Sequence, residues 1–194
     1  MTRARKFEIL DALPATGPAY IPVSDDGRSY SGQGFVVRFF SSGGESWVAN
    51  FKPGLTEFND VFDFESSDKV AVIAGGALYV MNPDEHKPEQ TYGASFRSAI
   101  RLANQNVLLM DDTQITEVKP SGALWGSPRI SWDGFKAIVV EHDKLTGLSF
   151  DPMDAAHEWV PFSIDLSTKE VEGGSYLKYY LEPVTITKKW WKFW

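Results

Sequence analysis

Apolar and polar positions in the middle of the chain follow the pattern of a β-hairpin. The apolar run Val107–Met110 predicts one strand and the alternating residues Gln114–Val118 predict its partner. Between them, Asp111–Thr113 has the composition of a tight turn, and Pro120 ends the second strand. This segment therefore predicts a short antiparallel pair with a polar turn.

The same pattern occurs once more upstream. Val70–Ala74 predicts a strand, Gly75–Gly76 a two-residue turn and Ala77–Met81 the returning strand, with Pro83 as the stop. Four pairs of equivalent residues are each separated by 37 positions: Val70 and Val107, Ile73 and Met110, Leu78 and Ile115, Pro83 and Pro120. This regular spacing predicts an internal repeat.

Two looser copies flank these hairpins. Residues 135–165 contain a leading strand, the strand Lys144–Phe150 and a return after a longer loop. Residues 35–54 hold a degenerate copy, with Phe35–Phe40 and Ser46–Phe51 as its strands. A repeat of about 40 residues with three strands is typical of small sheets that cover one another's apolar faces.

We therefore predict an all-β fold, a β-propeller-like array of about four to five small antiparallel sheets, formed as one domain by residues 1–187. A β-sandwich or a barrel is the alternative, because regular short strands suit those folds too. We also expect Phe7–Leu10 to pair with a strand near Tyr176–Leu181, which would remove an open edge.

Composition narrows the range of functions. The chain has 194 residues, 14% of them aromatic, and no cysteine, so disulfides, thiolate catalysis and cysteine-bound zinc are excluded. The formal net charge of −7 argues against nucleic-acid binding. Acidic residues gather in segments 57–92 and 141–172. They predict either a solvated β surface or a face for a basic partner.

Targeting signals are weak. The basic start, residues 1–6, resembles the first part of a signal peptide, but acids and Pro14 interrupt the sequence that follows it. No apolar run approaches the length of a transmembrane helix. We expect a cytoplasmic location.

Candidate catalytic residues are few. The histidines His86, His142 and His157 each stand beside acidic residues, and the chain has no Gly-x-Ser-x-Gly motif. We interpret them as polar loop residues. His142 with Asp143, Asp151 and His157 is the one cluster that would suit a metal, and we expect neither a metal site nor a cofactor.

Two other motifs have a structural and a functional interpretation. The pairs Asp111–Asp112 and Asp151/Asp154 suit calcium or Asx turns, and we favour turns because neither has the spacing of a calcium loop. Gly32 and Gly34 lack the third glycine and the helix of a phosphate-binding loop. We place Trp132 and Trp159 in the core.

The C-terminal segment 188–194 interleaves three lysines with four aromatic residues. Such a mixture suits a bilayer surface, a partner-binding peptide, or an arm that packs on the body of the protein or on another subunit. We treat it as a tail distinct from the domain.

The segment Asn104–Trp125, with its Leu-Leu, Ile-x-x-Val-x-Pro-x-Gly and Leu-Trp elements, resembles the blade repeats of bacterial β-propellers. The run from Ser131 to Tyr176 is similar to stretches of uncharacterised bacterial proteins of about this size. A lone Trp132-Asp133 dipeptide occurs without the Gly-His partner of the common propeller repeats, and no kelch pattern occurs. The resemblance implies a fold and no activity.

These observations favour a non-catalytic binding protein that holds a protein partner on a loop or on one face of its surface. In the specific form of this hypothesis, the chain is an immunity protein and its partner is a basic toxin that it neutralises. The residues expected to contact the partner are Trp125, Asp151, Asp154, His157, Glu158, Trp190, Trp191 and Trp194. One alternative is a hydrolase or lyase with Asp, Glu and His loop residues at the channel mouth. Another is a peripheral membrane protein anchored through the tail. Converging histidines and carboxylates would favour the enzyme, and a flat, acidic, aromatic patch the partner.

Overall fold

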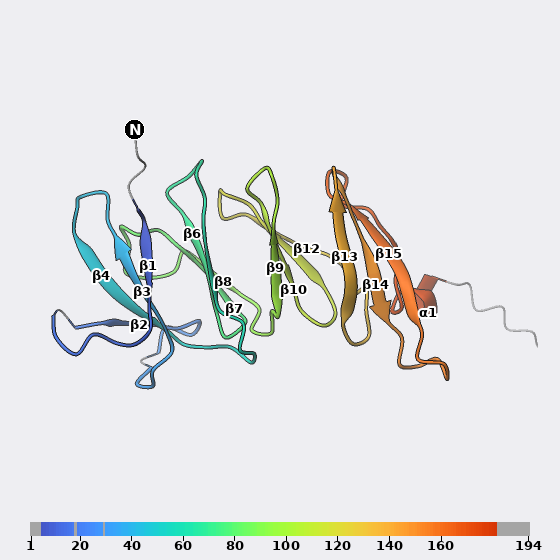
Figure 1. Ribbon diagram of the computed structural model, residues 1–194, viewed down its shortest axis with the longest axis horizontal. Coiled ribbons are helices and arrows are strands. Elements are labelled where there is room, and N and C mark those ends of the chain that lie inside the picture. The colour runs from blue at the N-terminus through green and yellow to red at the C-terminus, as the bar shows by residue number, and fades with distance from the viewer. Residues whose placement is uncertain (1–4, 18, 29, 182–194) are drawn as a thin grey trace, which may run out of the picture. The chain divides into compact units, whose positions relative to one another are not determined.

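The strands of this protein form four separate sheets of four strands each (Figure 1). The computed structural model describes residues 5–17, 19–28 and 30–181. Its elements are β1 (Phe7–Leu10), β2 (Ile21–Val23), β3 (Phe35–Phe40), β4 (Ser46–Phe51), β5 (Asp60–Asp63), β6 (Val70–Ala74), β7 (Ala77–Met81), β8 (Gln90–Tyr92), β9 (Ser98–Arg101), β10 (Val107–Met110), β11 (Ile115–Val118), β12 (Leu124–Gly126), β13 (Phe135–Glu141), β14 (Lys144–Phe150), β15 (Trp159–Asp165), β16 (Val171–Gly173) and α1 (Lys178–Leu181).

We name the sheets in chain order. Sheet A has the strand order β1-β3-β4-β2, sheet B β5-β6-β7-β8, sheet C β9-β10-β11-β12 and sheet D β13-β14-β15-β16. Sheets B, C and D are antiparallel meanders, whereas β2 lies parallel to β4 in sheet A. The all-β class and the array of about four small sheets are confirmed, and among the described strands none closes into a barrel.

The predicted repeat is visible in the strand register. Asp60 lies opposite Ile73 in sheet B, and Ser98 lies opposite Met110 in sheet C. These residues are the equivalents that the spacing of 37 to 38 positions predicts. Sheets B and C are therefore two copies of one hairpin-based unit, with the same pairing between their first and second strands.

The two copies close the same hairpin with different chemistry. In sheet B, Gly75 and Gly76 adopt φ angles of 53° and 83°, a left-handed pair that suits a two-residue hairpin turn. In sheet C, the carboxylate Oδ1 of Asp111 accepts hydrogen bonds from the backbone N–H groups of Thr113 and Gln114 at 2.6 and 2.7 Å. The interpretation of Asp111 as a turn residue is confirmed, because its side chain holds the backbone there.

The core of the first three sheets lies in two clusters. Residues of sheets A and B, including Phe51 and Tyr79, form the first, and residues of sheets B and C, including Ile73 and Leu109, form the second. Every residue of β6 and β7 is buried, because alternate side chains enter alternate clusters. A central sheet covered on both faces is not the two-sheet sandwich that we held as an alternative.

The chain divides into two compact units, Met1–Gly126 with sheets A to C and Ser127–Trp194 with sheet D and α1. The single domain over residues 1–187 stays a prediction. Sheets B, C and D each have a fourth strand that we did not expect, and these strands (β8, β12 and β16) have only three residues each. The expected strand near Tyr176–Leu181 was wrong, since residues 175–177 form a turn and α1 follows.

Within the described part of the chain, no helix has the length and apolar character that crossing a membrane requires.

Candidate functional site

Sheet D has one buried face and one exposed face. Paired residues of antiparallel strands point to the same side, so the register sorts the side chains. Leu145, Phe162 and Ile164 lie on one side and are buried. The other side is the outward face of sheet D, with Lys136, Val139, Glu141, Lys144, Thr146, Leu148, Phe150, Trp159, Pro161, Ser163, Asp165 and Glu172.

One end of this outward face is aromatic. The rings of Phe150 and Trp159 lie 5.1 Å apart, and the Lys136 ammonium lies 4.0 Å from the centre of the Trp159 ring. His157 meets Phe150 edge-on at 6.1 Å. Trp159 is only partly buried, so its expected place in the core was wrong. A partly exposed indole with a cation over its face is suited to contact with another molecule.

The opposite end of the face is acidic and hollowed. A shallow hollow of about 380 Å³ is lined by Glu141, His142, Asp143, Lys144, Thr146 and Asp165. The backbone N–H groups of Thr168 and Ser167 donate to Asp165 and hold its pKa below the usual range. Asp165 therefore keeps its negative charge over the physiological pH range.

The loop between β14 and β15 is held closed by its own backbone. The N–H of Asp151 donates to the carbonyl of Glu158 at 2.8 Å, and the N–H of His157 donates to the carbonyl of Asp154 at 2.9 Å. The Asp154 carboxylate accepts from the N–H of Ala156. Met153, His157 and Glu158 are exposed on this loop, which extends the aromatic end of the face.

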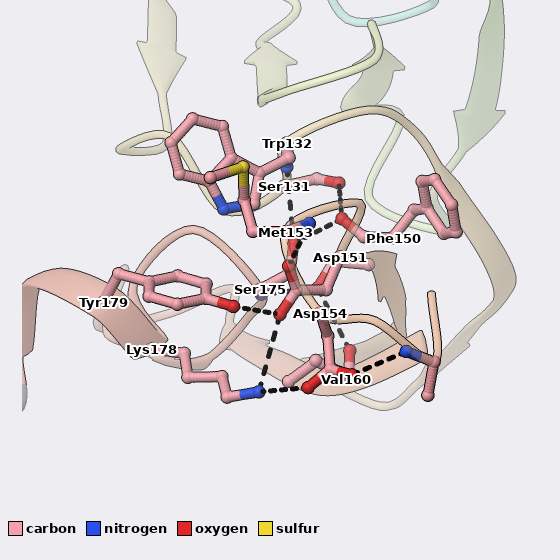
Figure 2. Close-up of polar contacts among 12 residues, drawn as sticks. Ser131, Trp132, Phe150, Asp151, Met153, Asp154, Val160, Ser175, Lys178 and Tyr179 are labelled. Atoms are coloured by element: carbon pink, nitrogen blue, oxygen red, sulfur yellow. Dashed lines mark hydrogen bonds and ion pairs between the residues drawn. The ribbon is translucent and has the colours of Figure 1, made fainter. Parts of the chain in front are cut away.

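Asp151 is the centre of a polar network beneath the loop (Figure 2). Its side chain is fully buried and accepts from the N–H of Met153 and the hydroxyl of Tyr179, each at 3.0 Å. Lys178 forms ion pairs with Asp151 at 3.5 Å and with Asp154 at 3.8 Å. Both Lys178 and Tyr179 belong to α1, so this network attaches α1 to the loop.

The electrostatics of the network agree with its geometry. Burial and, next, the hydrogen bond to Asp151 raise the pKa of the Tyr179 hydroxyl, so this group stays a donor. Trp132 packs beside it, with ring centres 4.7 Å from Tyr176 and 6.3 Å from Tyr179. The Trp132 indole N–H is buried without a hydrogen-bond partner among the described residues.

The structure brings some of the predicted partner-contacting residues together. Asp151, Asp154, His157 and Glu158 lie in one loop, but Asp151 faces inward and has a structural task. Trp125 lies in β12, in the other unit, opposite Glu117. Trp190, Trp191 and Trp194 lie outside the described residues. Their role in partner binding stays a prediction.

Sequence reasoning missed the strand residues of the outward face. The alternation of exposed Lys144 and Thr146 with buried Leu145 in β14 was the available signal. Lys136 could not be assigned in this way, because a bulge between Lys136 and Val139 shifts the register and Ala137 has a φ of 52°.

The histidines of sheet D do not converge. His142 lies between β13 and β14, and His157 follows β14 at its other end. A seven-residue strand such as β14 spans roughly 23 Å, which is too far for two ligands of one ion. In the portion of the chain that is described, no three His, Asp or Glu side chains are placed to hold a metal.

Comparison with known proteins adds no relative. No family model, curated protein or solved structure matches this chain. The functional argument therefore depends on the residues of sheet D themselves.

Proposed function

We propose that this chain is a non-catalytic binding protein on a bacterial propeller-like scaffold, and that the outward face of sheet D holds a basic protein partner. The observation that carries this proposal is one exposed strand face with the Phe150–Trp159 pair at one end and an acidic hollow at the other. Aromatic residues flanked by charge are typical of the centre of protein interfaces.

The size of the face supports a role for the neighbouring loop. Three seven-residue strands and the three-residue β16 at the usual spacing cover roughly 380 Å², about half of what each partner contributes to a standard interface. The exposed residues Met153, His157 and Glu158 enlarge the surface beside Trp159. The loop residues expected from sequence thus extend the strand face.

Charge favours a basic partner. Residues 127–181 contain nine acidic and five basic side chains, and Glu141, Asp165 and Glu172 share the outward face. Complementary charge speeds association and selects against acidic competitors. A toxin-neutralising immunity protein is the specific form that we propose, which the net charge of −7 supports.

The enzyme alternative has less support. A hydrolase or lyase would need a base and its partner group within hydrogen-bond reach of one point. His142 and His157 lie at opposite ends of β14, and the buried Asp151 is occupied by Tyr179 and Lys178. The membrane-surface alternative depends on tail residues outside the described range.

Affinity capture tests the proposal. The full-length chain is immobilised and incubated with lysate of the source organism, and retained proteins are quantified by mass spectrometry. Two variants of the face, Trp159→Ala and the exposed pair Glu141→Lys with Glu172→Lys, are compared with Leu55→Ser. Leu55 is 82% exposed and lies in the other unit, so it controls for loss of surface apolar area.

A basic protein should be retained by the wild type and by Leu55→Ser. Each face variant should weaken its binding by about 30-fold, the effect of losing one central interface residue. The charge-reversed pair keeps the proposal testable if Trp159→Ala lowers stability, because both glutamates are exposed. Equal retention by all variants would show that the outward face is not the binding surface.

A further inference from the structure

The chain has a basic, aromatic segment that the proposed function does not use. Residues 182–194 follow α1 directly and contain Lys188, Lys189 and Lys192 among four aromatic residues. Resting on the proposed function of the outward face, we propose that this segment docks on that same face within its own chain, and competes there with the protein partner.

The segment starts at one end of sheet D. Tyr179 donates to Asp151, the residue that immediately follows Phe150 at the end of β14. The segment therefore leaves α1 at the aromatic end of sheet D. The network of Asp151 with Lys178 and Tyr179 fixes this point, because the Asp151 carboxylate lies 3.5 Å from the Lys178 ammonium and 3.0 Å from the Tyr179 hydroxyl.

The segment is long enough to cover the face. The strands of sheet D span roughly 23 Å, whereas the ten residues from 182 to 191 reach roughly 33 Å when extended. Trp190 and Trp191 can thus reach the hollow beyond Thr146 and still leave chain for Trp194. A shorter segment, ending at Thr187, would stop before the acidic end.

Charge complementarity selects the same end. The hollow is bordered by Glu141, Asp143 and Asp165, with Lys144 as its cation. The tail presents three lysines there, and its aromatic residues can cover the shallow hollow of about 380 Å³. Opposite charges on neighbouring strand positions attract, whereas an acidic segment would be repelled.

Attachment to the same chain makes the contact effective even if it is weak. A short flexible connection holds a segment at an effective concentration in the millimolar range near its site. A partner then binds only the fraction of molecules whose face is open, and its apparent affinity falls by that fraction. The tail would therefore set the apparent affinity of the proposed site for its protein partner.

Disulfide trapping tests this docking, because the chain has no cysteine of its own. The full chain with Thr146→Cys and Phe193→Cys is oxidised mildly and compared with Asp133→Cys and Phe193→Cys. Thr146 lies in the middle of the outward face, and Asp133 is exposed at the aromatic end but off the strand face. Random collision favours Asp133, because it is closer to the start of the tail.

The intrachain disulfide should form about ten times faster with Thr146→Cys than with Asp133→Cys, and adding Glu141→Lys and Glu172→Lys should remove this difference. Equal rates would overturn the inference, as would disulfides that form between two chains.

The two proposals can fail separately. If trapping fails while the face variants still lose the partner in affinity capture, only the tail proposal falls. If trapping succeeds while those variants retain the partner, the proposed function falls.

Discussion

Asp151→Ala should lower the free energy of unfolding of the sheet D unit by about 3 kcal/mol, the low end for breaking a buried ion pair. The Asp151 side chain is fully buried, and its removal would leave the Tyr179 hydroxyl and the N–H of Met153 without their acceptor. Lys178 is 37% exposed and can turn to water, which keeps the loss from being larger. Hydrogen–deuterium exchange of the β14 and β15 amides measures this unit by itself.

Asp154→Ala is the matched control. Asp154 belongs to the same loop and pairs with the same lysine, but its side chain is 33% exposed and the ion pair is 3.8 Å long. We expect a loss below about 1 kcal/mol for such a contact. Similar losses for the two variants would contradict the account in which the buried Asp151 is the main anchor of α1 on the loop.

Alkaline pH should destabilise the unit of sheets A to C by about 3 kcal/mol, because the buried phenol of Tyr79 ionises. Burial and, next, the charges of Asp25 and Asp26 raise the pKa of Tyr79 from 10.0 to about 12. The folded state holds the phenol proton more tightly than the unfolded state. This stabilisation is therefore complete below pH 10 and is lost as pH rises from 10 towards 12.

Tyr79→Phe should be less stable than the wild type at the lower end of that pH range and more stable at its upper end. Near pH 8 the variant should be about 1 kcal/mol less stable, because the Tyr79 hydroxyl no longer donates to the carbonyl of Lys52. Above pH 11 it should be the more stable protein, since it has no buried phenol to ionise there. Urea unfolding at both pH values measures this, with Tyr92→Phe as an exposed control in the same unit. The same pH dependence in wild type and Tyr79→Phe would contradict the assignment.

The repeated hairpins were predictable because their signals are local. The runs around Val70 and Val107 are apolar, and Gly75–Gly76 and Pro120 mark a turn and a stop in the sequence itself. The short strands β8 and β16 were missed because three polar or mixed residues show no alternation. A strand at residues 20–23 was predictable and is found as β2, but its parallel pairing with β4 has no sequence signature.

The candidate site was only half predictable. The loop with His157 and Glu158 was found from its length and polar composition. The contact between Asp151 and Tyr179 joins residues 28 positions apart, and no local sequence pattern predicts such a contact. The orientation of Trp159 was missed because an indole in a strand suits either face, and only the register with Phe150 decides between them.

Site-specific photo-crosslinking tests the central claim most directly. A photoreactive benzoylphenylalanine replaces Thr146 in the middle of the outward face, and in a second protein it replaces Leu55. After irradiation in lysate of the source organism, position 146 should crosslink a basic protein that position 55 does not, and Trp159→Ala should abolish that product. The same crosslinked proteins from both positions, or a product from position 146 that is unaffected by Trp159→Ala, would contradict a binding surface on sheet D.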